Sequence, residues 1–170
     1  MKMKCYGIRS RLPNKGNPEF VILADFDGTP LEDVENAALE QIEKRKLSDF
    51  FIVTSINKKE HYHLYCPTKV SYDEYEQILL EFNKNGMDSN FMHPFYNWDK
   101  EKTTILRFHS PEKGKLKLVK TIKSPHRNKR EMSLAHLRFL KCVFGIDINV
   151  YHNIDNNPQA TVDTYFTSKK

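Results

Sequence analysis

Residues 21–28 read Val-Ile-Leu-Ala-Asp-Phe-Asp-Gly, an apolar run that ends in two carboxylates and a glycine. A short apolar run closed by glycine is typical of a buried β-strand. Side chains two residues apart share one face of a strand, so Asp25 and Asp27 are expected to lie together, with Phe26 opposite. Neighbouring carboxylates repel each other unless a cation or proton lies between them. The stretch therefore predicts a site for a hard divalent ion, although Asp-Gly is also ordinary turn chemistry.

The composition is that of a folded globular protein, with 39% hydrophobic and 12% aromatic residues in a chain of 170. This length predicts one domain, residues 1–170. Lysine and arginine outnumber aspartate and glutamate by 27 to 22, an excess that allows a polyanionic partner where the charge is clustered. The three cysteines form no Cys-x-x-Cys pair, and no apolar run approaches the length of a membrane span. We therefore expect a cytoplasmic protein with no membrane contact.

Hydrophobic periodicity predicts both strands and helices along the chain. Strands are expected at 2–12, 21–27, 50–55, 61–66, 102–109, 115–122 and 161–166, and helices at 31–46, 70–85, 91–98 and 133–144. The two strands within 50–66 are expected to form a hairpin. This order predicts an α+β fold in which the helices pack on one face of a mixed or antiparallel sheet.

Two further groups of residues have the composition of a functional site. His61 and His63 share one strand face, and imidazoles bind phosphate or metal, transfer protons, or simply pack as half-buried core residues. Residues 113–130 contain eight lysines and arginines and no acid, a pattern typical of phosphate binding or of a solvated strand face. The basic residues are Lys113, Lys115, Lys117, Lys120, Lys123, Arg127, Lys129 and Arg130.

Together these motifs resemble the archaeo-eukaryotic primase (primase-polymerase) superfamily, whose catalytic core is a modified RRM-like fold. Its three motifs are an apolar run that leads into Asp-hydrophobe-Asp/Glu, then small-x-His, then an apolar residue followed by Asp. Residues 21–27, His61-Tyr62-His63 and Met87-Asp88 are similar to these in the same order, with His61 in place of the small residue. Residues 104–113, with Arg107, are similar to a strand and Pro-Lys turn of the family. The resemblance covers about residues 18–122, and a C-terminal helix and tail follow at 123–170.

The resemblance implies a DNA primase or polymerase that adds nucleotides on a single-stranded DNA template. Asp25, Asp27 and Asp88 would be the catalytic carboxylates and would bind two Mg²⁺ or Mn²⁺ ions. The residues implied to contact the nucleoside triphosphate are His63, His61, Arg107, Lys113 and Lys115. The remaining basic residues, Lys117, Lys120, Lys123, Arg127, Lys129 and Arg130, would bind the nucleic acid. A helicase or another replication protein is an expected partner, and so small a core is typical of a virus or plasmid.

Three alternatives stay open. Asp25-Phe26-Asp27-Gly28-Thr29 also resembles the first motif of haloacid-dehalogenase-type phosphatases, which use a nucleophilic aspartate, but no Gly-Asp-x-x-x-Asp motif follows. His61-Tyr62-His63 also resembles the metal motif of HUH-type rolling-circle replication endonucleases, but no tyrosine here has lysine three residues later. The same basic residues would also suit a catalytically degenerate replication protein that only binds single-stranded nucleic acid.

Overall fold

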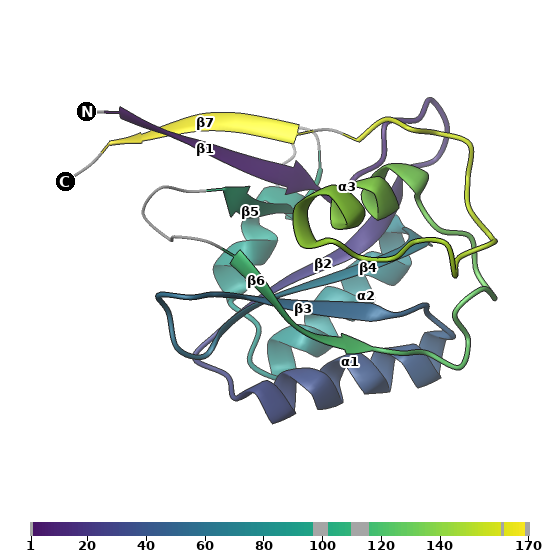
Figure 1. Ribbon diagram of the computed structural model, residues 1–170, viewed down its shortest axis with the longest axis horizontal. Helices are drawn as coiled ribbons and strands as arrows, with labels where there is room; N and C mark the ends of the chain where they lie inside the picture. Colours follow the sequence, from purple (N-terminus) through teal and green to yellow (C-terminus); the bar gives the residue numbers. More distant parts are fainter. Residues whose placement is uncertain (1, 97–101, 110–115, 161, 169–170) are drawn as a thin grey trace.

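The computed structural model describes residues 2–96, 102–109, 116–160 and 162–168, and Figure 1 shows their arrangement. Along the chain the elements are β1 (Lys2–Arg9), β2 (Glu19–Asp27), α1 (Leu31–Arg45), β3 (Phe50–Ser55), β4 (His61–Ser71), α2 (Tyr72–Lys84), the 3-10 helix η1 (Ser89–Tyr96), β5 (Ile105–His109), β6 (Leu116–Ile122), α3 (Leu134–Phe144) and β7 (Val162–Ser168). The predicted α+β class is confirmed.

The strands form two antiparallel sheets where the sequence had predicted one. The larger sheet has the order β2-β4-β3-β6, and the smaller has the order β5-β1-β7. The predicted hairpin of β3 and β4 is confirmed. The two sheets meet at the outer edge of β2, where the Val21 amide donates to the Ser10 carbonyl over 2.9 Å. The element that carries the two aspartates therefore lies next to the smaller sheet (Figure 1).

Alternation along β2 sends its side chains to two different helical layers. Phe20 packs on Tyr75 and Phe26 on Phe82, both from α2, with ring centroids 5.5 and 5.6 Å apart. The intervening Leu23 faces a small apolar cavity that α3 also lines. Both faces of the strand are thus buried, as its continuous apolar run requires.

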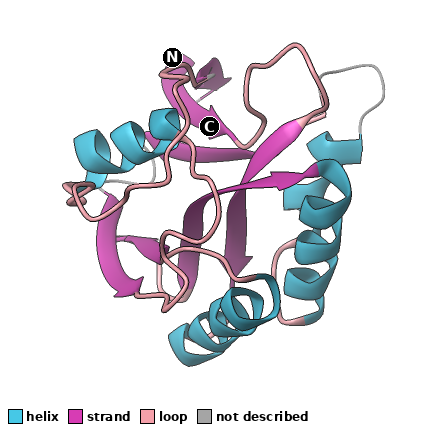
Figure 2. Cartoon of the chain, turned by 90° about the vertical axis from the view of Figure 1, so that its right-hand side faces the viewer, coloured by secondary structure: helices cyan, strands magenta, loops and turns pink. Residues whose placement is uncertain are grey.

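The prediction that every helix packs on one face of the sheet is wrong for α3. Figures 1 and 2 show α1 and α2 on one side of the larger sheet and α3 on the other. Tyr65 of β4 contacts Phe139 and Phe144 from the α3 side, with ring centroids 5.8 and 5.5 Å away. Both faces of the larger sheet are apolar, and the apolar face of a helix can pack on either one. The sequence pattern of α3 therefore did not specify the side of the sheet.

The start of α2 differs from the prediction by two residues because Ser71 caps it. The Ser71 hydroxyl accepts a hydrogen bond from the Glu74 amide over 3.2 Å, and Val70 stays in β4, paired with Phe20.

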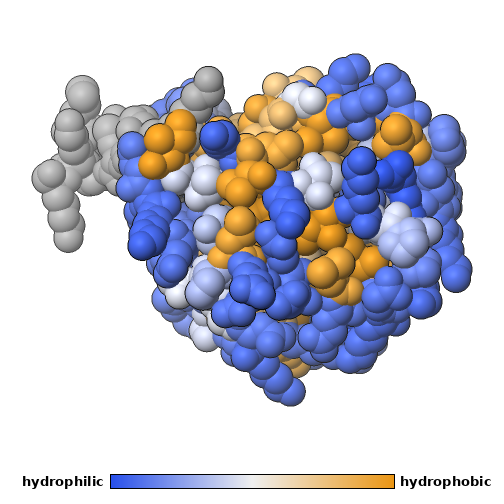
Figure 3. Space-filling model, turned by 60° about the horizontal axis from the view of Figure 1, so that its bottom comes forward, coloured by the Kyte–Doolittle hydropathy of each residue, from blue (hydrophilic) through white to orange (hydrophobic). Residues whose placement is uncertain are grey.

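Figure 3 shows mainly hydrophilic side chains, with apolar ones between them, on the face that comes forward from the bottom of Figure 1. Within the described part of the chain, no helix is long and apolar enough to cross a membrane.

Candidate functional site

The pairing of β2 with β4 places the two aspartates opposite the two histidines. Asp25 is the partner of His63 in the antiparallel register, and Asp27 is the partner of His61. Directly paired residues project from the same face of a sheet, so all four side chains lie on the face opposite α2. Phe26 contacts α2 on the other face, as the alternation predicted.

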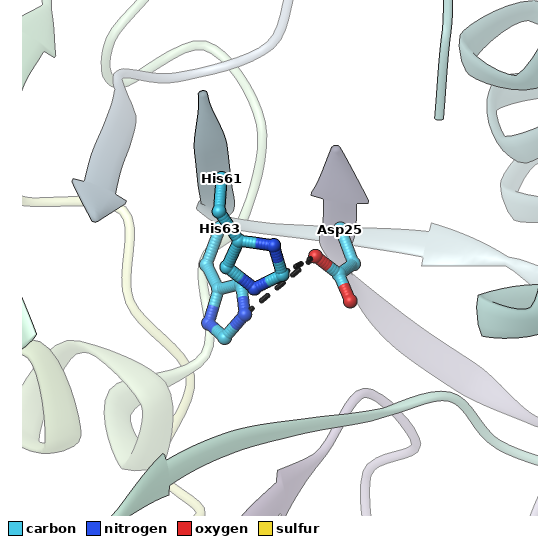
Figure 4. Close-up of side chains that lie close together, drawn as sticks. All are labelled: Asp25, His61 and His63. Carbon is cyan, nitrogen blue, oxygen red and sulfur yellow. Dashed lines mark ion pairs between the residues drawn. The ribbon is translucent and has the colours of Figure 1, made fainter. Parts of the chain in front are cut away.

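Three of these side chains converge closely enough to hold a metal ion. Nε2 of His63 lies 3.6 Å from Oδ1 of Asp25, and Nε2 of His61 lies 3.7 Å from the same oxygen. Figure 4 shows both rings directed at that single carboxylate oxygen. One ligand atom from each of the three residues lies within 4.8 Å of the other two. The group Asp25-His61-His63 therefore has the donor atoms and the spacing of a possible metal site.

Burial distinguishes the two aspartates, which the sequence pattern treats as equivalent. The side chain of Asp25 is 21% exposed, whereas that of Asp27 is 62% exposed. His61 and His63 are both buried. Oδ1 of Asp27 lies 3.4 Å from Nδ1 of His61, whereas the other ring nitrogen, Nε2, is the one near Asp25. Asp25 is thus the central carboxylate of the site, and Asp27 lies at its solvent side.

The strand face that carries the two histidines also carries a buried phenol. Tyr65 follows His63 on the same face of β4 and is 2% exposed. Burial, together with the nearby charge of Asp25, raises the pKa of Tyr65 well above its ordinary range. This hydroxyl therefore stays protonated at any physiological pH.

Asp88 and Arg107 join Asp25 and His63 around one cavity of about 210 Å³. The Asp88 amide donates a 3.0 Å hydrogen bond to the Asp25 carbonyl, so the turn after α2 is fastened to the end of β2. Arg107 comes from β5. The other residues that line the cavity are Asn90, Phe91, Pro94, Ile105 and Leu106.

The turn that presents Asp88 is held by specific local contacts. Gly86 has φ +107°, a conformation that favours glycine, and its carbonyl accepts a 3.1 Å hydrogen bond from the Thr29 hydroxyl. Oδ1 of Asp88 accepts from the Asn90 amide over 3.0 Å. Asn90 was not predicted as a site residue; the only signal was Asp88 itself, because an aspartate side chain often accepts from the backbone amide two residues later.

The predicted basic residues divide into two sets. Lys120, Arg127 and Arg130 form ion pairs with Glu35, Asp49 and Glu74, at 2.8, 2.9 and 2.6 Å. Lys117, Lys123 and Lys129 are exposed. Lys113 and Lys115 lie outside the described residues. The ion-paired residues fasten separate parts of the fold together, so less charge is available to a polyanion than the sequence alone suggests.

The structure therefore brings together Asp25, His61 and His63 as one donor group, and Asp25, His63, Asp88 and Arg107 around one cavity. The expected metal set of Asp25, Asp27 and Asp88 stays a prediction. His61 was predicted, with His63, to bind phosphate or metal or to transfer protons, and the family resemblance implied that it contacts the nucleotide. Its position opposite Asp27 follows from strand pairing, which the sequence did not specify. Comparison of the chain with protein-family models, curated proteins and solved structures gives no match.

Proposed function

We propose that this protein is a nucleotidyltransferase of the primase-polymerase type, which adds nucleotides on a single-stranded DNA template. The observation that carries the proposal is the cavity lined by Asp25, His63, Asp88 and Arg107. These residues come from four separate segments, and all four were expected at such a site from their motifs. Two carboxylates next to a guanidinium and an imidazole provide donors for a cation and for the phosphates that accompany it.

The side chains have complementary tasks in this proposal. Asp25 and Asp88, with Asp27 beside them, would hold Mg²⁺ or Mn²⁺, because carboxylate oxygens are the ligands that these ions prefer. The ions would supply charge neutralisation for the triphosphate and a lowered pKa for the attacking 3′-hydroxyl. Arg107, which also lines the cavity, donates to phosphate oxygens, and its planar guanidinium can bind two of them at once. His63 donates to the phosphates from β4.

The chain order also supports the proposal. The segment β2-α1-β3-β4-α2 has the order β-α-β-β-α, and β4 lies between β2 and β3 in an antiparallel sheet. This arrangement is compatible with an RRM-like core, in which the catalytic carboxylates would come from the first strand. The haloacid-dehalogenase interpretation requires a parallel, doubly wound sheet, whereas the described strands pair antiparallel.

The test is incorporation of labelled nucleoside triphosphates on single-stranded DNA with Mg²⁺ or Mn²⁺. Asp25→Asn should lower incorporation at least about 100-fold, because it removes charge stabilisation at the reacting phosphates. Asp147→Asn, which changes an exposed acid far from the cavity in the sequence, is the matched control and should leave activity unchanged. A different result would identify a binding protein instead. In that case wild type and Asp25→Asn would bind DNA equally well and in a salt-dependent way, and wild type would not incorporate nucleotides.

A second candidate function is metal-dependent DNA cleavage of the HUH type. The Asp25-His61-His63 group favours it, because these enzymes hold their ion with a His-x-His pair. Such an enzyme also requires a tyrosine nucleophile, and the tyrosines whose side chains are described do not line the cavity. Tyr165 belongs to β7, and its side chain is outside the described part of that strand. Formation of a covalent protein–DNA adduct that is lost in Tyr165→Phe would favour cleavage over nucleotide addition.

A further inference from the structure

We propose that Asp25, His61 and His63 form a tetrahedral site that prefers Zn²⁺ to Mg²⁺. This inference deepens the proposed function by naming the ion that these three residues bind. Only the role of that ion in nucleotide addition rests on the proposed function. The starting point is His61, which occupies the position of the small residue in the second motif of the primase-polymerase superfamily. That imidazole adds a second nitrogen donor to the nitrogen of His63 and the carboxylate oxygen of Asp25.

The two distances to Asp25 are too long for hydrogen bonds and suitable for two ligands of one ion. They are 3.6 Å from His63 and 3.7 Å from His61, beyond the usual range of an N–H to oxygen bond. Tetrahedral Zn²⁺ with bonds of about 2.0–2.2 Å separates its ligand atoms by about 3.3–3.5 Å. Octahedral Mg²⁺ with bonds of about 2.0–2.1 Å places adjacent ligands only about 2.9 Å apart. The observed spacing is closer to the tetrahedral geometry.

The environment of His61 also points to a missing partner. Its side chain is 6% exposed, and among the described residues neither ring nitrogen has a hydrogen-bond partner. Buried polar groups in folded proteins are nearly always satisfied by protein, water or an ion. Nε2 lies 3.7 Å from Oδ1 of Asp25, and the ligand atoms of the three residues lie within 4.8 Å of one another, so a cation between them would satisfy it.

Asp27 is positioned to support His61 as a ligand. Its Oδ1 is 3.4 Å from Nδ1 of His61, the nitrogen that would carry the proton when Nε2 binds metal. A carboxylate behind a ligating imidazole fixes the tautomer and the ring orientation. The second carboxylate of the Asp-x-Asp motif would thus act through His61 here. Asp25 and His63 line the cavity, so the fourth position of the ion would face it and would accept water or a phosphate oxygen.

Ligand type separates zinc from magnesium independently of distance. Imidazole nitrogen suits zinc and the later first-row metals, whereas magnesium prefers carboxylate, carbonyl and water oxygen. Two imidazoles and one carboxylate resemble the protein ligands of a catalytic zinc ion more than those of a magnesium ion. In this arrangement His63 meets the phosphates through the ion.

The test is titration of the metal-free protein with Zn²⁺, Co²⁺ and Mg²⁺ in the absence of nucleotide, followed by calorimetry and visible absorption. Wild-type protein should bind one Zn²⁺ far more tightly than Mg²⁺, and bound Co²⁺ should show the intense absorption of a tetrahedral complex. His61→Ala should weaken Zn²⁺ binding more than about 100-fold, and Asp27→Asn should weaken it by about 10–100-fold. The matched control is His126→Ala, which removes another histidine whose Nε2 is 3.7 Å from a carboxylate, that of Glu43, and which should leave binding unchanged.

Equal binding of Zn²⁺ by wild type and a folded His61→Ala variant would overturn the inference. If that variant does not fold, the wild-type protein alone decides, because weak octahedral Co²⁺ absorption or a preference for Mg²⁺ would overturn it. Failure here is distinguishable from failure of the proposed function. Zinc binding without nucleotide incorporation would refute only the proposed function, and Mg²⁺-dependent incorporation without zinc binding would refute only this inference.

Discussion

Acid should destabilise the protein through His136, a buried imidazole of α3. Its Nε2 lies 2.9 Å from the carbonyl oxygen of Arg9, which can only accept, so Nε2 carries the ring proton. Nδ1 then accepts a 2.8 Å hydrogen bond from the Ser133 hydroxyl. The neutral ring thus uses both nitrogens, and a second proton would remove the acceptor for Ser133.

The size of the effect follows from the pKa of this histidine. Burial lowers the pKa of His136 from 6.5 to about 4, although the bond to Arg9 and the charge of Asp155 act in the opposite direction. Between these two pH values the unfolded chain binds more protons than the folded one, so stability falls as the pH falls. At about 1.4 kcal/mol for each pKa unit, His136 should cost about 3 kcal/mol of folding free energy at pH 4 and almost nothing above pH 7.

The assay is urea unfolding of wild type and His136→Gln at pH 7, 6, 5 and 4. Glutamine can still donate to the Arg9 carbonyl but does not titrate, and every other ionisable group is common to both proteins. Wild type should therefore lose about 3 kcal/mol more than the variant between pH 7 and pH 4. His152→Gln, at an exposed position, should change with pH as wild type does. Parallel loss of stability in wild type and His136→Gln would refute the reasoning.

Two further predictions concern Glu81 of α2 and Gly86, which lies in the turn before Asp88. Burial alone would raise the pKa of Glu81, but hydrogen bonds from Lys44 and neighbouring side chains lower it to about 2. The contribution of Glu81 to the free energy of unfolding is therefore present above pH 4.5 and lost as the pH falls through 2. After allowance for solvent screening, Glu81→Gln should lower the free energy of unfolding by about 1–2 kcal/mol at pH 7, measured by urea unfolding. An unchanged unfolding midpoint would contradict this. Gly86→Ala would place a Cβ 2.4 Å from the Thr29 hydroxyl at φ +107°, and should cost about 1–3 kcal/mol and reduce nucleotide incorporation. Gly145→Ala, at φ +71° with no atom within 4 Å of the new Cβ, is the control; a loss of incorporation there equal to that in Gly86→Ala would show that the Thr29 contact is irrelevant.

Local sequence patterns were sufficient for most of the secondary structure. Alternation in residues 21–27 predicted that Asp25 and Asp27 share a face and that Phe26 lies opposite, and contact of Phe26 with Phe82 confirms it. The reason is that side-chain direction along a strand depends only on its own backbone. The 3-10 helix Ser89–Tyr96 replaces the helix expected at 91–98, whose last two residues lie outside the described residues. Pro94 in its interior cannot donate to a preceding carbonyl, which favours this shorter form over a regular α-helix.

The neighbours of each element were decided only by the tertiary structure. Which strands pair and where a helix packs depend on the free energy of the whole fold, because the contacts join segments that are distant in the sequence. A local pattern contains no information on which distant segment becomes the neighbour. The pairing of β2 with β4 placed His61 and His63 beside Asp25, and the bridge between Phe26 and Met87 brought Asp88 to the same end of the strand. The sequence by itself determined which residue types could form a cation site, and tertiary packing determined which of them meet.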